Sequence, residues 1–261
     1  MIRSYLFAPG HNEKLLGKVF EAGADAVILD LEDAVPPEYK AAARARVAAA
    51  LPAHPAWVRI NAVGTPLAAD DLAAVAAHAH GIRIPKVESA DDVRWVVERA
   101  PAKPLICAIE TAKGVANALA IAAVPGVRHL ALGGIDLQKD LGVDDGDAPL
   151  RYVRSHLVIA SRAAGIAPPI DSVYPHLRDT DGLARQAAGA RSLGFGGKSA
   201  IHPTQLQTIH AAFGTREDDL DWARRVVHAF ERAGGAAVQL PDGEFVDLPV
   251  AERARRILQS Q

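Results

Sequence analysis

The chain has 261 residues, a length that fits one large α/β domain or two small ones. Lys+Arg 29 against Asp+Glu 31 give a formal net charge of -2, so no broad basic field exists to attract nucleic acid or an anionic membrane. No segment approaches ~18 uninterrupted apolar residues, and the N-terminal apolar stretch is too short for a secretion signal. We therefore expect a soluble, cytoplasmic protein with neither a nucleic-acid nor a membrane partner.

The single cysteine also fits a cytoplasmic location. Cys107 lies inside the apolar run PLICAI, where a buried structural thiol is a better interpretation than a nucleophile. It has no second cysteine with which to form an internal disulfide, which fits a reducing cytoplasm.

Short apolar runs alternate with helix-like segments from the N-terminus onward. The strand-like runs are SYLFAP, AVILDL, WVRI, GIRIPK, PLICAI, HLALGG, PPIDSV and FGGK. Helical spacing is clearest around Leu15–Phe20, over 36–50, 66–79, 89–99 and 111–122, at Leu183, Ala187 and Ala190, and at Leu206, Ile209 and Phe213. Within 111–122, a stripe is predicted to face the sheet, formed by Ala112, Val115, Ala116, Leu119 and Ala120.

Eight β–α units over residues 1–214 favour a closed (β/α)₈ TIM barrel over an open doubly wound sheet. Such a barrel uses eight short parallel strands and leaves no edge. An open sheet more often carries GxGxxG after its first strand, where this chain reads APGHNEK.

The tail, residues 215–261, has a different pattern. A charged helical segment, EDDLDWARRVVHAFERA, precedes two β-like stretches separated by PDGE, and a closing helix follows. We interpret the tail as a short lid or arm that contacts a neighbouring subunit.

Acidic residues follow several of the predicted strands. Glu110 follows PLICAI and Asp136 follows HLALGG, so in a barrel both reach the same rim from neighbouring strands. Each one taken alone fits a helix-capping role. Two carboxylates with open positions suit Mg²⁺, and together with Arg59 they favour a metal site.

More charged residues follow the second and third strands. Asp30 and Glu32 alternate with Leu31, so in extended geometry they share a face, and we expect them to orient metal-bound water or to serve as the base. Asp33 is adjacent. Arg59 ends WVRI and is suited to holding a carboxylate or an enolate, although it could instead pair with one of these acids.

Three residues near the predicted eighth strand carry weaker indications. His202 in GGKSAIHPTQ has no HxH or HxxxH partner, so loop packing is its commoner role. Lys198 also fits a core or loop-anchoring role. Gly196 allows close backbone approach.

At these residues the chain resembles the citrate lyase β-subunit-like branch of the HpcH/HpaI aldolase family, which includes malyl-CoA and citramalyl-CoA lyases. The matching stretches include RSYLFAPGHNEK, DAVILDLEDAV, VRINAVGTP, AIETAKGVANA, GGIDLQKDLG and GFGGKSAIHPTQ. The resemblance implies a TIM barrel, Mg²⁺ on Glu110 and Asp136, and Arg59 at the reacting group. It also implies that Phe7, Lys18 and His202 contact the CoA-bearing substrate.

The tail adds a further implication of the resemblance. Asp247 of EFVDLP matches an aspartate that reaches a neighbouring subunit's site as acid or base, within a homotrimer. Asn12 departs from the basic residue of malyl-CoA-type relatives and leans toward the citrate-lyase-like branch.

The resulting functional hypothesis is a Mg²⁺-dependent carbon–carbon lyase that converts a β-hydroxyacyl thioester into an acyl thioester and a 2-oxoacid, or runs the reverse condensation. Arg59 would stabilise the enolate, Asp30 or Glu32 would help remove the hydroxyl proton, and Asp247 would exchange a proton at the enolate carbon. Two alternatives are a class II aldolase acting on free 2-oxoacids and a β subunit whose substrate is bound to an acyl-carrier protein.

Overall fold

The computed structural model describes residues 2–144 and 146–259, which divide into two compact units, Ile2–Phe213 and the part from Gly214 onward. The first unit is a closed barrel of eight parallel strands in sequential order, with β1 hydrogen-bonded to both β2 and β8. The predicted (β/α)₈ barrel is therefore confirmed. Its strands are β1 (Ser4–Pro9), β2 (Ala26–Asp30), β3 (Trp57–Arg59), β4 (Gly81–Ile84), β5 (Leu105–Ile109), β6 (Val127–Leu132), β7 (Ile170–Asp171) and β8 (Gly197–Ala200).

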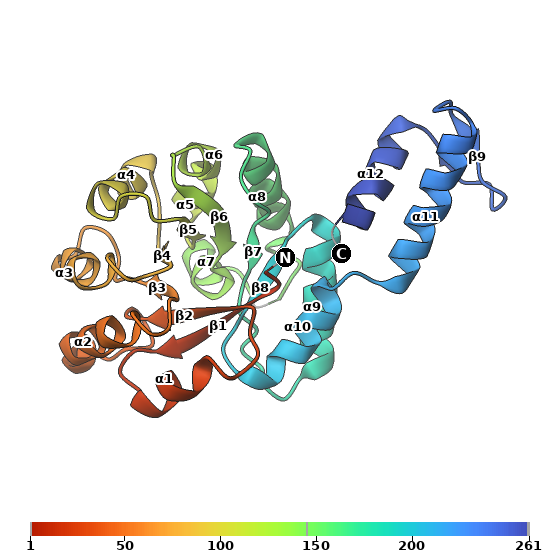
Figure 1. The fold of residues 1–261 in the computed structure, drawn as a ribbon. Coiled ribbons are helices and arrows are strands. Elements are labelled where there is room, and N and C mark those ends of the chain that lie inside the picture. The colour runs from red at the N-terminus through yellow and green to blue at the C-terminus, as the bar shows by residue number, and fades with distance from the viewer. Residues whose placement is uncertain (1, 145, 260–261) are drawn as a thin grey trace. The chain divides into compact units, whose positions relative to one another are not determined.

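Helices surround the barrel in Figure 1. They are α1 (Glu13–Val19), α2 (Lys40–Ala50), α3 (Pro66–Val75), α4 (Ala90–Arg99), α5 (Ala112–Ala116), α6 (Ala118–Ala122), α7 (Gly134–Leu141), α8 (Arg151–Ala163), α9 (Thr180–Leu193) and α10 (Leu206–Phe213). Two 3₁₀ turns, η1 (Pro37–Tyr39) and η2 (Pro203–Gln205), precede α2 and α10.

The stripe predicted over 111–122 is wrong. The segment is two short helices, α5 and α6, separated at Asn117, whose side chain donates to the carbonyl of Glu88 (2.7 Å). The buried residues Gly114, Ala118 and Ile121 keep helical spacing across the break, but on a different face from the predicted stripe, and Leu119 is 50% exposed. The predicted period therefore holds, and the predicted face does not.

Alternation along the strands produces two apolar layers and positions the pocket. Outward-facing residues such as Leu29 and Val58 belong to the core between barrel and helices. An inner cluster fills the barrel itself and consists of Tyr5, Ile28, Trp57, Ile106, Ala131 and Ile170, with Phe7 and Ala26 packed against it. Two positions further along β2, β3 and β4, the same inward face carries Asp30, Arg59 and Arg83, which are paired across neighbouring strands. Charged groups thus form the layer above an apolar floor.

Close packing of that floor depends on a glycine. A Cβ on Gly81 would lie 2.4 Å from a ring carbon of Trp57. Gly81 precedes Arg83 by two residues and faces the same side of β4, so the indole occupies the space beneath the arginine. The absence of a side chain at this position lets the large ring close the barrel interior.

The second unit is a helical pair with a small hairpin. Helix α11 (Glu217–Arg232) and helix α12 (Leu248–Gln259) flank the antiparallel strands β9 (Val238–Gln239) and β10 (Phe245–Val246). Its own core includes Ala223, Val226 and Phe230 from α11, with Leu240 and Val246 from the hairpin. The predicted order of helix, PDGE turn and closing helix is confirmed. None of the helices in the described parts of the chain combines the length and apolar character needed to cross a bilayer.

Candidate active site

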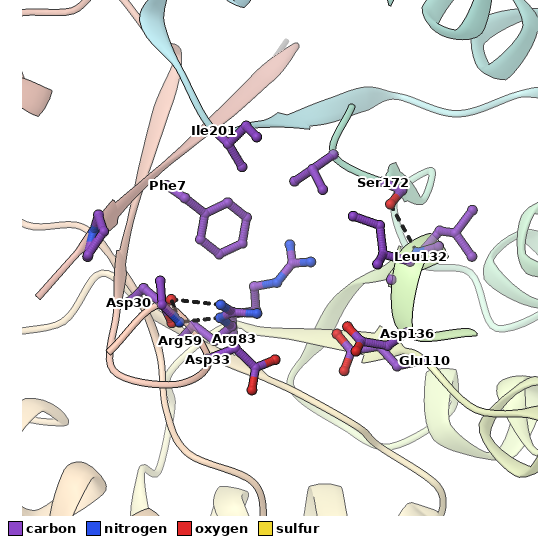
Figure 2. Close-up of a pocket in the computed structure, with 16 residues that line it drawn as sticks. Phe7, Asp30, Asp33, Arg59, Arg83, Glu110, Leu132, Asp136, Ser172 and Ile201 are labelled. Carbon is purple, nitrogen blue, oxygen red and sulfur yellow. Dashed lines mark hydrogen bonds and ion pairs between the residues drawn. The ribbon is translucent and has the colours of Figure 1, made fainter. Parts of the chain in front are cut away.

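A cavity of about 470 Å³ lies at the carboxyl ends of the barrel strands. Its lining includes Phe7, Asp30, Arg59, Arg83, Glu110 and Asp136 (Figure 2). The carboxyl ends of the strands are the face at which TIM-barrel enzymes place their catalytic groups. Five of the charged residues singled out from the sequence, Asp30, Asp33, Arg59, Glu110 and Asp136, thus come together with Phe7 in one pocket.

Arg59 is held by two carboxylates. Its Nε lies 2.6 Å from Oδ1 of Asp30 and its Nη2 lies 2.7 Å from Oδ2, while Nη1 lies 2.9 Å from Oε2 of Glu32. Burial opposes the charge of Arg59, but these partners raise its pKa above the usual value. The guanidinium is therefore a permanent cation in one fixed orientation.

Glu32 is buried and is not part of the cavity lining. Its Oε1 accepts from the ammonium of Lys86 at 2.6 Å, and the same ammonium lies 3.2 Å from Oδ1 of Asp33. Burial raises the pKa of Glu32, while Arg59 and Lys86 oppose that rise. Glu32 therefore links two cations and is a poor candidate for direct contact with a substrate.

Lys86 adopts a strained backbone conformation at the end of β4. Its φ is +50°, a value uncommon for residues other than glycine. In this conformation its backbone N–H donates to Oε2 of Glu110 (3.2 Å) while its ammonium reaches Glu32. The strained residue connects the acidic groups after β2 with the one after β5.

Glu110 and Asp136 lie side by side on one wall of the pocket in Figure 2. Glu110 is buried, and its pKa is raised to about 7, first by burial and then by the charge of Glu32, with Asp136 also contributing. The carboxylate occupies space that a side chain at Gly133 would fill, since a Cβ there would lie 2.2 Å from Cγ of Glu110. The fold therefore keeps a buried acid beside another acid, an arrangement that a cation would stabilise.

The donor set fits Mg²⁺ better than a metal that needs a full protein cage. Among the described residues no cluster of three or more His, Cys, Asp or Glu side chains could hold a metal ion. Mg²⁺ is usually bound by one or two carboxylates, with water and substrate oxygens filling the remaining positions. Glu110 and Asp136 would supply those two carboxylates.

Arg83 is a charged residue of the pocket lining that the sequence did not single out. It is 3% exposed, its guanidinium carbon lies 5.1 Å from the centre of the Phe7 ring, and burial together with Arg59 lowers its pKa to about 10. The sequence held a signal for it, since an arginine inside the apolar strand GIRI must face either the barrel interior or the helices. Phe7 also contacts Arg59, whose guanidinium carbon lies 5.0 Å from the ring centre.

The other proposed substrate contacts lie outside the cavity lining. Lys18 is exposed on α1, and His202 is exposed at the start of η2, where its Nδ1 accepts the N–H of Thr204 (3.3 Å). Ile201, the residue before His202, does line the pocket. Lys18 and His202 remain predictions for the more distant parts of a long substrate.

Asp247 belongs to the second unit and caps a helix there. Its Oδ1 accepts the N–H of Val250 (3.2 Å), and its carbonyl accepts that of Ala251 (2.9 Å) at the start of α12. Its proposed chemical role stays a prediction.

Lys198 and Cys107 have structural surroundings, as expected. The ammonium of Lys198 is fully buried and donates to Asp171, to Gln186 and to the carbonyl of Ser172, each at 2.6 Å. Cys107 is buried, and burial raises the pKa of its thiol.

A parallel barrel with four acidic and two guanidinium groups at its carboxyl-end pocket is typical of enzymes that bind a metal and an anionic substrate. Residues 3–203 match the model of the HpcH/HpaI aldolase/citrate lyase family, and the chain belongs to that family.

Individual relatives cover nearly the whole chain. It is 37% identical over 275 residues to the citrate lyase subunit beta-like protein of Deinococcus radiodurans, covering 99% of this chain and 96% of that protein. It is also 37% identical over 262 residues to a (3S)-malyl-CoA thioesterase of Cereibacter sphaeroides (strain ATCC 17029 / ATH 2.4.9), covering 94% of this chain and 89% of that protein.

A solved structure is similar over the same extent. This is the CitE protein of Mycobacterium tuberculosis in complex with magnesium, acetoacetate and coenzyme A, with a TM-score of 0.87, 35% identity, and coverage of 98% of this chain and 97% of that one.

Proposed function

We propose that the protein is a Mg²⁺-dependent carbon–carbon lyase that cleaves a β-hydroxyacyl thioester into an acyl thioester and a 2-oxoacid, or forms it from them. The observation that carries this proposal is the placement of Glu110 and Asp136 in the same pocket as the fixed guanidinium of Arg59. The relatives support it, since one is named for malyl-CoA and the similar CitE structure holds magnesium and coenzyme A.

The reaction breaks the bond between the hydroxyl-bearing carbon and the carbon next to the thioester carbonyl. The hydroxyl passes its proton to water in the cavity and becomes the ketone of the 2-oxoacid, while the electron pair of the broken bond forms the thioester enolate. Bound Mg²⁺ supplies polarisation of the hydroxyl or ketone oxygen and the neighbouring carboxylate. Arg59 stabilises the negative charge that develops on the enolate oxygen.

Asp30 acts by positioning Arg59. Its two oxygens accept both guanidinium contacts and also the backbone N–H groups of Glu32 (2.9 Å) and Ala34 (3.2 Å). Both oxygens of Asp30 are therefore engaged in holding Arg59 and the backbone that follows β2. Asp247 gives the enolate carbon its proton, from a tail that we propose reaches a neighbouring subunit of a homotrimer.

The cellular context follows from the substrate and the cysteine content. Acyl-CoA thioesters are the substrate class we assign, and the single buried Cys107 suits the reducing cytoplasm.

The test is an assay of the purified full chain against a panel of β-hydroxyacyl-CoA thioesters with Mg²⁺ and with EDTA. We expect release of a 2-oxoacid that requires Mg²⁺ and is absent in Glu110→Gln. Cleavage of the free hydroxyacid at a comparable rate would favour the class II aldolase instead. Activity on the acyl-carrier thioester with none on the CoA thioester would identify the carrier-dependent β subunit. The chain is 35% identical to a protein named as a β subunit, the citrate lyase subunit beta of Escherichia coli (strain K12).

A further inference from the structure

Arg83 is a buried cation whose charge no carboxylate of the described residues neutralises by direct contact. Its Nε and Nη1 are buried and have no hydrogen-bond partner in the part of the chain that the structure describes. Arg59, one strand away, has every guanidinium nitrogen within 2.9 Å of a carboxylate oxygen. Two arginines of the same layer therefore differ, one being satisfied within the protein and the other not.

Arg83 lines the cavity, so part of its guanidinium can meet a ligand there. In Figure 2 its side chain rises into the pocket, away from the pair formed by Arg59 and Asp30. Trp57 closes the barrel beneath it and Phe7 flanks it, so neither neighbour offers an acceptor. Leaving charged donors buried and unpaired costs free energy, which an anionic ligand in the cavity would recover.

We propose that Arg83 binds the second carboxylate of a dicarboxylic 2-oxoacid and so determines which oxoacid the enzyme accepts. This inference rests on the proposed function. Glu110 and Asp136 would hold Mg²⁺, which would supply polarisation of the ketone and the first carboxylate of the oxoacid, and Arg59 is assigned to the enolate. The guanidinium of Arg83, which lines the same cavity and has no carboxylate partner among the described residues, then remains for a further carboxylate.

The ion pairs around the pocket leave Arg83 without a direct partner among the residues described. Asp30 is paired with Arg59, Glu32 and Asp33 share Lys86, and Glu110 and Asp136 are assigned to the metal. A monocarboxylic oxoacid would leave the charge of Arg83 unpaired. A dicarboxylic oxoacid brings one more negative charge at a distance of one or two carbons from its ketone.

The experiment compares oxaloacetate and pyruvate, which differ by one carboxylate. Fresh solutions of each are titrated into the full chain with Mg²⁺, and Kd is measured by calorimetry, with decarboxylation followed separately. We expect the wild type to bind oxaloacetate at least 10-fold more tightly than pyruvate, since a charge-assisted contact typically contributes about 10- to 100-fold. Arg83→Met should raise the Kd for oxaloacetate by about that factor and leave the Kd for pyruvate within about 2-fold of the wild-type value.

Two further variants separate recognition from structure. Arg83→Lys keeps the charge without the fork and should recover part of the preference, whereas Arg94→Met, on the exposed face of α4, should leave both Kd values unchanged. If Arg83→Met does not fold, the ratio of the wild-type Kd values for pyruvate and oxaloacetate remains the test. Equal affinity of the wild type for both oxoacids, or an unchanged ratio in a folded Arg83→Met, would overturn the role of Arg83 and leave the proposed lyase intact. Failure of the wild type to bind either oxoacid would overturn the proposed function and this inference with it.

Discussion

Arg59 and Asp30 form a two-pronged ion pair across neighbouring strands, with Nε–Oδ1 at 2.6 Å, Nη2–Oδ2 at 2.7 Å and Asp30 fully buried. Parallel pairing of β2 with β3 places the two residues opposite each other. Because both carboxylate oxygens are engaged, the guanidinium has little freedom to rotate. The pair therefore fixes the direction from which Arg59 meets a substrate.

Asp30→Asn should impair the enzyme through Arg59. The amide cannot offer two anionic acceptors, and the remaining buried cation loses its main partner, so we expect the free energy of unfolding to fall by about 3 kcal/mol. We expect kcat to fall on the order of 10²-fold through misplaced charge stabilisation. Urea unfolding and steady-state kinetics measure the two effects.

A matched control is Asp91→Asn, which removes a carboxylate from an exposed ion pair with Arg94. Exposed pairs contribute little, so neither stability nor kcat should change measurably. Wild-type kcat and stability in Asp30→Asn would show that Glu32 alone suffices to hold Arg59.

The sequence predicted the barrel because eight apolar runs recur with helices between them, and it predicted that acids after β5 and β6 share a rim. It raised a pairing of Arg59 with one of the acids after β2 but could not single out Asp30, since that depends on the register between β2 and β3. Arg83 was missed because the sequence GIRI does not show whether its arginine faces the barrel interior or the surrounding helices. The α5–α6 break depends on a long-range hydrogen bond from Asn117 to the carbonyl of Glu88, which no local pattern contains.

Gly133→Ala should weaken Mg²⁺ binding without removing any carboxylate. The added Cβ would lie 2.2 Å from Cγ and 2.7 Å from Oε1 of Glu110, so the buried acid must move. Its backbone has φ of -100°, which alanine adopts readily, so strain in the backbone is not the cause. We expect Kd for Mg²⁺, measured by calorimetry, to rise about 10-fold or more.

Gly189→Ala is the companion variant, because a Cβ there meets nothing within 4 Å and the site lies inside α9. Alanine is favoured over glycine in a helix, so this variant should be slightly more stable and bind Mg²⁺ normally. Equal Mg²⁺ affinity in Gly133→Ala and wild type would exclude Glu110 as a ligand.

Glu110 should make the metal-free protein less stable as the pH rises. Its folded-state pKa of about 7 exceeds the ordinary value of 4.5, chiefly because of burial. Stability from the protonated acid is complete below about pH 4.5 and is lost as the pH rises through about 7, because the folded state must then hold a buried charge. Glu110→Gln avoids this loss.

In EDTA, Glu110→Gln should be more stable than wild type at pH 8 by on the order of 3 kcal/mol, and the difference should nearly vanish at pH 5. Urea unfolding at both pH values tests this, with Glu98→Gln on exposed α4 as the variant expected to follow the wild type. Mg²⁺ added at pH 8 should stabilise the wild type and not Glu110→Gln. Parallel pH profiles for wild type and Glu110→Gln would mean that the acid is not buried in solution.

The final prediction separates the chemical role of Asp247 from its capping role. Its side chain accepts the N–H of Val250 at the start of α12. Asparagine caps helices as well as aspartate, so Asp247→Asn should keep the stability of the wild type and lose activity if the carboxylate transfers a proton. Asp247→Ala should lose both activity and about 1 kcal/mol of stability.

Mixing chains then tests whether the tail acts on a neighbouring subunit. Asp247→Asn and Glu110→Ala are each expected to be inactive, because one lacks the proton donor and the other a metal ligand. In a mixed oligomer, an Asp247→Asn barrel with an intact Glu110 can receive an intact tail from a Glu110→Ala chain, so some activity should return after subunit exchange. If the tail instead serves its own barrel, every site keeps one defect. Exchange verified by mass spectrometry without any recovered activity would therefore assign the tail to its own subunit.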